Sequence, residues 1–306
     1  MPEAQLPDFG SKAQTAIKRD YIAVAVLSAV IAAAALIFFY LSHALLLYGD
    51  AVAHINIARR VFDSRTPGLV QLGTVWLPLP HLLNIPFVMN DWLWRTGLGA
   101  SVPSMIAFVA GTLGVFRLVC GLAPRGLASR SAAWLAALVY VMNPNLIYMQ
   151  ATAMTEALYL ALFIWAAVFF SEFARQAPAD APMARRSLER CAIALCAAMM
   201  VRYDGWFLAA IIGGGVCMVL WRQPGNRGML GGAVLRSFLL VVLTATLWLA
   251  YNHAAYGNAL EFANGPYSAR AIAQQSRTPT MMSHPGENDP RTAALFFLKV
   301  SRLNLG

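Results

Sequence analysis

Charged residues are scarce in this chain. Asp, Glu, Lys and Arg together make up 12% of its 306 residues, whereas 59% of the residues are hydrophobic. A soluble domain carries about a quarter charged residues. Apolar runs also recur along the whole length, which indicates a protein that crosses the membrane several times. The scarcity of charge therefore excludes a soluble globular domain and an anchored soluble one.

Cysteine is rare as well, which excludes a fold held together by disulfides or by cysteine-bound metal ions. The four cysteines lie within or at the ends of apolar runs, at Cys120, Cys191, Cys196 and Cys217. None lies in a polar loop where an oxidising compartment would pair it, and none has the spacing of metal ligands. We therefore expect these cysteines to be small residues that pack between helices. The net charge is +9, but the basic residues form no patch interleaved with aromatic residues, so we expect no nucleic-acid partner.

The apolar runs predict an all-α, polytopic transmembrane bundle of about seven spans, with interfacial helices in the first outer loop. The predicted spans are Tyr21–Tyr48, Leu98–Leu122, Ser131–Tyr148, Ala153–Phe173, Cys191–Val201, Trp206–Trp221 and Leu235–Tyr251. The first run is too long for a signal-peptide h-region and has no small-residue cleavage site, so we interpret it as a retained span.

The distribution of Lys and Arg predicts the orientation. With the amino terminus inside, every predicted inner loop is basic, whereas among the outer loops only the first is, at Arg59, Arg60 and Arg65. This is the positive-inside pattern of a multi-pass cell (inner) membrane protein. We therefore expect a cytoplasmic tail at 1–20, a transmembrane domain at 21–256, and a last part at 257–306 that comprises an extracytoplasmic loop and the start of a further apolar segment. That loop ends where a further apolar segment starts, as in a fragment or a short family member.

Two apolar segments are too irregular or too short to span. Trp76–Met89 contains three prolines, which break helices, so we expect an interfacial or re-entrant segment. Cys191–Val201 is too short at about 1.5 Å per residue. We expect it to form a hairpin with the next run, its tip VRYDGW lying in the outer leaflet. Arg202 and Asp204 then lie in the membrane, where ionisable groups are usually functional; the alternative is a pair that snorkels to the interface.

Polar residues gather on the predicted outer face, whereas the inner halves of the spans are expected to be apolar. Asp50 follows directly on the first span, and His54 lies four residues later, on the same face of a helix. The other members of this group are Asn143, Asn145, Thr155, Glu156, Arg202, Tyr203, Asp204, Asn252 and His253. This segregation predicts an outward-facing polar cavity; the alternative is a set of solvated interfacial side chains.

The residue types in this group suit a lipid-linked phosphate. There is no Ser-His-Asp order, no HExxH, no Walker loop and no GxGxxG after a strand. An arginine binds phosphate through charge-assisted hydrogen bonds, and a carboxylate can take a proton from an attacking hydroxyl. A phosphate leaves as a stabilised anion, so it needs charge neutralisation more than a general acid.

Three stretches carry a resemblance to a known family. They are GDAVAHINIARRVFDS with TVWLPLPHLL, then MNPNLIYMQATAMTEALYLALF, and then VRYDGWFLA. In order and spacing they resemble the GT-C glycosyltransferase superfamily, whose members include protein O-mannosyltransferases and aminoarabinose transferases. The resemblance covers most of residues 20–220.

The resemblance implies an inverting transfer of a sugar from a polyprenyl-phosphate donor to an extracytoplasmic acceptor, which is a protein, a lipid or a glycan. It gives Asp50 the role of general base, and Glu156 a part in the acceptor or metal site. Arg202 is the best match for the phosphate-binding residue, with Arg59 or Arg60 as alternatives. His54, Asn143, Tyr203 and Asp204 are expected to support the site.

The resemblance departs from the family pattern at one position. Many relatives carry two adjacent acids in the first loop, whereas Asp50 is followed by Ala51. The need for a divalent metal therefore stays open, with Asp50, His54 and Glu156 as the ligands if one binds. His81 and Asp91 are expected to be solvated loop residues.

Two other classes of function stay open. One is a membrane transporter or a protein that handles lipid-linked substrates, in which Arg202, Asp204 and Glu156 bind an anion. Such a protein should have polar groups along the full depth of its spans. The other is an assembly subunit without an active site, in which Asp50 and Glu156 would be replaceable.

Overall fold

The computed structural model describes residues 11–122, 127–223, 227–275, 286 and 289–305. Within these ranges the regular elements are helices and no strand forms, which confirms the all-α prediction. The chain divides into two units, Met1–Ala259 and Leu260–Gly306.

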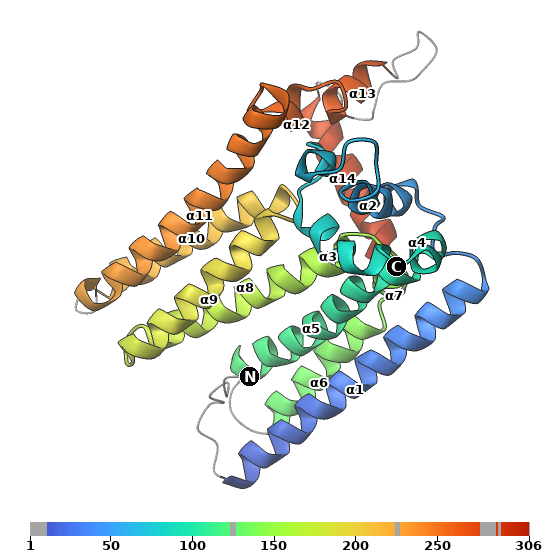
Figure 1. The fold of residues 1–306 in the computed structure, drawn as a ribbon. Coiled ribbons are helices and arrows are strands. Elements are labelled where there is room, and N and C mark those ends of the chain that lie inside the picture. Colours follow the sequence, from blue (N-terminus) through green and yellow to red (C-terminus); the bar gives the residue numbers. More distant parts are fainter. Residues whose placement is uncertain (1–10, 123–126, 224–226, 276–285, 287–288, 306) are drawn as a thin grey trace. The chain divides into compact units, whose positions relative to one another are not determined.

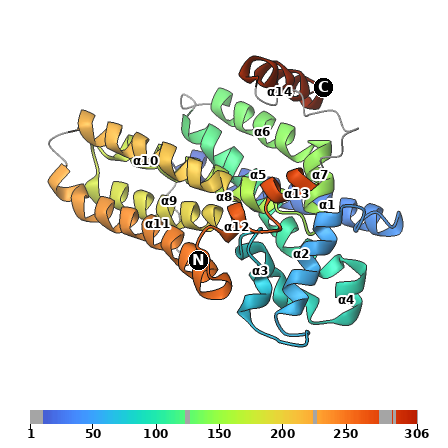
Figure 2. The same cartoon turned by 90° about the horizontal axis from the view of Figure 1, so that it is seen from above.

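The first unit is a bundle of long helices that run alongside one another (Figure 1). They are α1 (Ser11–Leu41), α5 (Leu98–Leu122), α6 (Leu127–Val141), α8 (Glu156–Gln176), α9 (Ala181–Met199), α10 (Asp204–Arg222) and α11 (Arg227–Tyr256). α1 and α6 pack on α5, α5 packs on α8, and α8 packs on α9, which in turn contacts α10 and α11 (Figure 2).

Shorter helices lie at one end of this bundle, which we call the first-loop end. They are α2 (Gly49–Arg60), the 3₁₀ helix η1 (Leu69–Leu72), α3 (Leu79–Val88), α4 (Asp91–Thr96) and α7 (Pro144–Gln150). All but α7 belong to residues 42–97, the first-loop segment. α3 holds much of the proline-rich run predicted to be interfacial, and at 10 residues it is too short to span.

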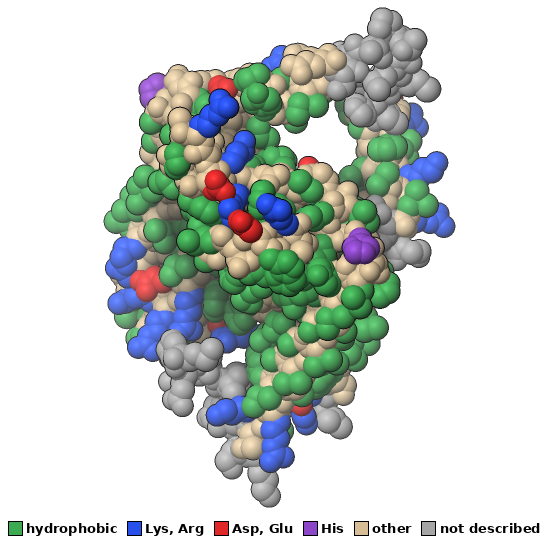
Figure 3. All heavy atoms as spheres, turned by 45° about the vertical axis from the view of Figure 1, so that its right-hand side comes forward, with side chains coloured by type: hydrophobic (Ala, Val, Ile, Leu, Met, Phe, Trp, Pro, Cys, Tyr) green, Lys and Arg blue, Asp and Glu red, His purple; other side chains and the backbone are tan. Residues whose placement is uncertain are grey.

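Several helices are suited to a lipid environment, which makes the chain an integral membrane protein. Among the described residues, five helices are long and apolar enough to cross a membrane, or six if α6 and α7 count as one broken span. They expose large apolar side chains, such as Val30 and Phe38 of α1 and Phe238 of α11. Figure 3 shows one face on which hydrophobic side chains form a broad surface.

The described residues hold fewer candidate spans than the seven predicted because α9 is not one of them. The predicted run Cys191–Val201 is the second half of a 19-residue helix that begins at Ala181. Its first half carries Arg185, Arg186, Glu189 and Arg190, so its composition is not that of a span. Small or apolar side chains at three- and four-residue intervals nevertheless bury one face of α9 in the core it shares with α8, at Ala184, Leu188, Cys191 and Leu195. Small side chains let two helices approach closely.

Two predicted spans are wrong at their outer ends. The first ends at Leu41 instead of Tyr48, and the backbone turns at His43, which has a left-handed φ of 55°. Asp50 therefore starts a separate helix and does not continue the span. The third breaks before Pro144, where α6 and α7 meet at a bend of 63°. Proline disfavours helical backbone in the residue before it and lacks the N–H that a continuing helix needs.

The other end of the bundle is not apolar, contrary to the prediction. Arg117 of α5 lies 2.7 Å from Glu172 of α8, and Arg130 of α6 lies 2.7 Å from Asp20 of α1. Both side chains of the first pair are mostly buried. A helical bundle tolerates such charges when each has a partner. The members of each pair are far apart in the sequence, so the pairing could not be read from it. The lack of inner polar groups therefore no longer counts against a transporter.

The predicted hairpin is present, and its tip fastens the first-loop segment. α9 ends at Met199 and α10 begins at Asp204. The carbonyl oxygen of Met200 accepts a hydrogen bond from Leu79 N at 3.0 Å. The phenol of Tyr203 donates to the carbonyl oxygen of Thr74 at 3.3 Å. The tip and the proline-rich segment, more than a hundred residues apart in sequence, thus form one structure.

The described residues of the second unit form three helices: α12 (Glu261–Asn264), α13 (Ala269–Gln275) and α14 (Pro290–Leu305). α14 exposes the apolar side chains of Leu295, Phe296, Phe297 and Leu298. The part expected to hold an outer loop, 257–306, is helical in places, and its residues 276–285, 287–288 and 306 lie outside the described part.

Gly205 is required for the hairpin by its lack of a side chain. A Cβ there would lie 2.6 Å from the backbone carbonyl of Ala198. We predict that Gly205→Ala destabilises the protein by about 1–3 kcal/mol through overpacking. Gly213→Ala is the control, because a Cβ at that position of α10 meets nothing within 4 Å. Thermal unfolding in detergent measures both, and equal stability of the two variants would contradict the prediction.

Candidate active site

One cavity of about 430 Å³ at the first-loop end gathers most of the polar residues singled out in the sequence. α2 contributes Asp50 and His54, the first-loop segment contributes Trp76, and the start of α8 contributes Glu156. The tip of the hairpin adds Arg202, Tyr203 and Asp204. Segments from three distant parts of the chain therefore form its wall.

The three carboxylates of this cavity share a structural position. Asp50, Glu156 and Asp204 each lie in the first turn of a helix, respectively α2, α8 and α10. Free backbone N–H groups and the helix dipole make a helix N-terminus favourable for negative charge. Three such termini meet at one cavity. The same field that accommodates the carboxylates suits an anionic ligand.

Arg202 joins two of these carboxylates. Its Nε lies 2.9 Å from Asp204 Oδ2, and its Nη1 lies 3.3 Å from Glu156 Oε1. The guanidinium carbon also lies 5.8 Å from the centre of the Tyr159 ring. The second terminal nitrogen, Nη2, forms no hydrogen bond or ion pair with the described residues. Arg202 therefore keeps N–H groups free for a ligand while its own position is fixed.

Asp50 and Glu156, the two carboxylates predicted to be catalytic, differ in their surroundings. Asp50 is exposed, and its carboxylate has no hydrogen bond or ion pair with any described residue. Glu156 is paired with Arg202 through Oε1, whereas its Oε2 is buried without a partner in the same part of the chain. Asp50 is thus free to accept a proton, and Glu156 is fixed in place.

His54 forms a buried pair with a residue that the sequence did not point to. His54 Nδ1 lies 2.8 Å from His81 Nε2. The prediction that His81 is a solvated loop residue is wrong, since its exposed fraction is 0%. Burial lowers the pKa of His54 to about 4 and that of His81 to about 3, so both rings are neutral at pH 7.

Tyr203 connects the site to the last helix of the bundle. Its hydroxyl accepts a hydrogen bond from Trp248 Nε1 at 3.2 Å while it donates to Thr74. Thr74 in turn bonds to the side chain of Asn252, which donates to the carbonyl oxygen of Trp248 at 2.8 Å. The wall formed by residues 74–77 is thereby held against α11. Thr74 and Trp76 belong to the stretch TVWLPLPHLL that carries the resemblance, but the sequence predicted no role for either in the site.

The structure does not bring three of the predicted site residues to this cavity. Arg60 and Arg59 line a different one, together with Trp94. Asn143 caps α7 by accepting a hydrogen bond from Leu146 N at 3.1 Å.

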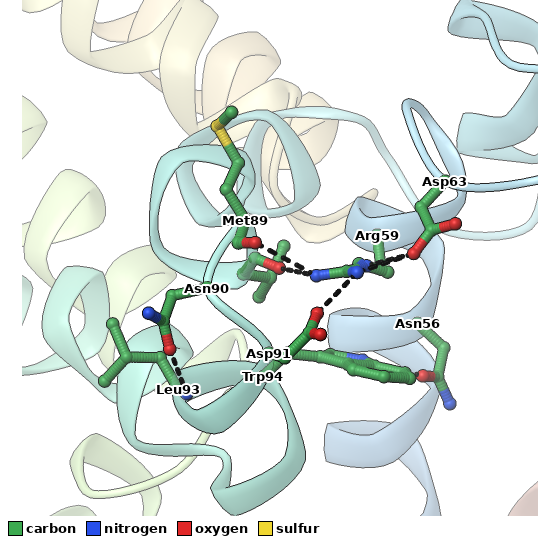
Figure 4. Close-up of polar contacts among 9 residues, drawn as sticks. Asn56, Arg59, Asp63, Met89, Asn90, Asp91, Leu93 and Trp94 are labelled. Atoms are coloured by element: carbon green, nitrogen blue, oxygen red, sulfur yellow. Dashed lines mark hydrogen bonds and ion pairs between the residues drawn. The ribbon is translucent and has the colours of Figure 1, made fainter.

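Arg59 organises the first-loop segment (Figure 4). Its guanidinium lies 2.6 Å from both Asp63 and Asp91, and it donates to the carbonyl oxygens of Val88 and Met89 at 2.8 and 3.1 Å. It also lies over the ring of Trp94. These contacts use the guanidinium fully, so Arg59 has no group left for a phosphate. They also show that Asp91 is an ion-pair partner and not simply a solvated residue.

The candidate metal ligands Asp50, His54 and Glu156 all line the 430 Å³ cavity but do not form a metal site. In the described residues, no group of three or more His, Cys, Asp or Glu side chains has the geometry to hold a metal ion. Two of the three candidates are also engaged elsewhere, Glu156 with Arg202 and His54 with His81.

A polytopic helical bundle with carboxylates and an arginine around a cavity at one end has the features of a membrane enzyme. The model of the dolichyl-phosphate-mannose-protein mannosyltransferase family matches residues 97–256, which is 160 of the 306 residues. The chain therefore belongs to that family and is a membrane glycosyltransferase of the class that uses a polyprenyl-linked sugar. No curated protein and no solved structure shows a significant match to the chain.

The matched residues include only part of the cavity. Glu156 and the tip residues Arg202, Tyr203 and Asp204 lie within the match. It begins at Gly97, so α2 with Asp50 and His54 lies outside it. The role of Asp50 therefore rests on its place in the cavity and on the resemblance of the first loop.

Arg59 is expected to be structural. We predict that Arg59→Met lowers stability by about 2 kcal/mol, because two backbone carbonyls at the end of α3 lose a charged donor. The ion pairs add little, since Asp63 and Asp91 are exposed. Limited proteolysis should show faster cleavage within residues 61–78. Arg65→Met, an exposed arginine in the same segment, is the control; matching cleavage rates would exclude this role.

Proposed function

We propose that this protein transfers a sugar from a polyprenyl-phosphate donor to a hydroxyl or comparable nucleophile of an extracytoplasmic acceptor, with inversion at the sugar carbon. The acceptor is a protein, a lipid or a glycan. One observation carries the proposal beyond the family level: a free carboxylate, Asp50, shares a cavity with a guanidinium, Arg202, that still has N–H groups to donate.

Asp50 acts as the general base in this proposal. The acceptor oxygen attacks C1 of the sugar as Asp50 takes its proton, and the bond between C1 and the phosphate oxygen breaks. A single displacement inverts the configuration at C1. A carboxylate without an ion-pair partner suits this task, because nothing competes for the lone pair that receives the proton.

Arg202 receives the phosphate. The leaving group is an anion, and a guanidinium binds its oxygens through charge-assisted hydrogen bonds. Glu156 and Asp204 hold the guanidinium in place before the donor arrives, so little reorganisation is needed during the reaction. Since Arg59 is used by the first-loop segment and Arg60 lines another cavity, we assign the phosphate role to Arg202 alone.

The cavity opens on the extracytoplasmic side in this proposal. At the opposite end of the bundle, α6, α8 and α10 carry Arg130, Arg175 and Arg222, which favours the cytoplasm for that end. The amino terminus then lies in the cytoplasm, and the donor reaches the cavity from the outer leaflet of the cell membrane. We leave divalent metal out of the proposed reaction because the three candidate ligands are not grouped around a common point.

Asp50→Asn tests the base. We predict a loss of sugar transfer of about a hundredfold or more, because the amide cannot take the proton, while the donor still binds. Transfer from a radiolabelled polyprenyl-phosphate sugar by protein in lipid nanodiscs measures it. Asp63→Asn is the control, since it neutralises a first-loop carboxylate outside the cavity. Full transfer by Asp50→Asn would remove Asp50 from the mechanism.

Arg202→Gln tests the phosphate contact. We predict that kcat/KM for the donor falls roughly tenfold to a hundredfold, the effect of losing hydrogen bonds to a charged group. Arg222→Gln at the far end of α10 is the matched control. A transport assay with the protein in sealed lipid vesicles addresses the other class: movement of the donor across the bilayer without sugar transfer would favour a transporter.

A further inference from the structure

The His54–His81 pair is the strongest feature that the proposed reaction leaves unused. It lies at the contact between α2 and α3, and both rings are buried. His54 also lies against Trp76, with 4.9 Å between ring centroids. Only His54 of the two lines the cavity. Its Nδ1 is turned to His81, so Nε2 is the nitrogen that it can present to a ligand.

The hydrogen bond between the two rings can form in two ways. A neutral imidazole has one N–H donor and one acceptor nitrogen, so one ring donates and the other accepts. If His54 Nδ1–H donates, His81 must carry its own proton on Nδ1. If His81 Nε2–H donates, its Nδ1 is unprotonated, and His54 carries its proton on Nε2, toward the cavity.

The surroundings of His81 decide between these arrangements. His81 Nδ1 is buried and has no hydrogen-bond partner among the described residues. A buried N–H without an acceptor is rarer in proteins than an acceptor without a donor. The arrangement in which His81 Nδ1 holds only a lone pair is therefore favoured. It leaves His54 with an N–H directed at the cavity.

A doubly protonated ring at this pair is unfavourable for a separate reason. The bond between the rings holds one hydrogen across 2.8 Å, so a further proton on either ring would leave an N–H on His81 Nδ1, which has no acceptor among the described residues. Arg202 faces His54 and Arg60 faces His81, and both oppose a further positive charge, while Asp50 alone favours one on His54. The neutral form of both rings is consistent with their low pKa values.

A neutral donor has a clear use in this cavity. The wall contains three carboxylates and one guanidinium, and the guanidinium is already shared by Glu156 and Asp204. An entering phosphate meets more negative than positive charge. A further N–H adds a hydrogen bond to the phosphate without any need for ionisation.

We propose that His81 is a positioning residue that fixes the tautomer of His54, so that His54 donates Nε2–H to the phosphate of the bound donor. This inference rests on the proposed function for the identity of the ligand. His54 is the residue that touches the phosphate, and His81 acts only through it.

The first experiment reads the tautomer directly. ¹⁵N chemical shifts of ring nitrogens distinguish protonated from unprotonated ones, and the chain has only five histidines to label. His54→Gln and His81→Gln identify the signals. At pH 7 we expect Nε2 protonated and Nδ1 unprotonated in both rings. A protonated Nδ1 on His54 with a bare Nε2 would overturn the proposal, whatever the enzyme's activity.

The second experiment tests the contact with phosphate. In nanodiscs, a polyprenyl phosphate without sugar is compared with the matching polyprenol. His81→Leu should weaken binding of the phosphate roughly tenfold, the cost of one hydrogen bond to a charged group, and leave polyprenol binding unchanged. His81→Gln keeps an N–H donor and should bind the phosphate within about twofold of the wild type. His253→Leu, an exposed histidine of α11, is the control.

The outcomes separate this inference from the proposed function. Unchanged phosphate binding by a folded His81→Leu variant would refute the role of His81. Equal loss in His81→Gln and His81→Leu would show a structural role only and would also refute it. Wild-type protein that binds the phosphate with the expected tautomer but transfers no sugar would refute the proposed function and leave the His81 assignment standing.

Discussion

The shared guanidinium of Arg202 is the contact on which the candidate site depends. It joins the first turn of α8 to the first turn of α10, through Glu156 at 3.3 Å and Asp204 at 2.9 Å. Without a cation between them, two carboxylates at converging helix ends would repel each other. With it, the helix ends can meet and the cavity keeps a positive group at its centre. Pairing of this kind restricts the guanidinium to one position, which is what recognition of a phosphate requires.

The first-loop segment supplies the other half of the cavity, and two anchors hold it there. On one side of α2, Arg59 connects α2 with the end of α3 and the start of α4. On the other, Tyr203 and Asn252 hold residues 74–77 against the hairpin tip and α11. α2 is thereby fixed between both, and its Asp50 and His54 face the same cavity as Arg202. The wall thus depends in part on residues outside the cavity, such as Arg59 and Asn252.

The comparison between sequence and structure shows where pattern reasoning succeeds. Long apolar runs gave the all-α membrane bundle, the hairpin and the gathering of Asp50, Glu156 and Arg202. Reasoning from patterns failed where a local feature interrupted an apolar run, as at His43 and Pro144. It also failed where one helix carries buried small residues beside charged ones, as in α9. It also failed for His81, Arg117 and Glu172. Each of these is explained by a partner far away in the chain, and periodicity contains no information about such partners.

The sequence by itself determined what the bilayer demands: apolar length, basic loops on one side and polar residues kept to helix ends. These are properties of single segments in contact with lipid or water, so composition and spacing reveal them. Only the tertiary structure decided which polar groups meet. It placed Arg59 in a structural network and Arg202 in the cavity, although both are arginines next to predicted outer-face motifs. Hydrogen bonds and ion pairs act over a few ångströms, so the roles of these residues follow from packing and not from order along the chain.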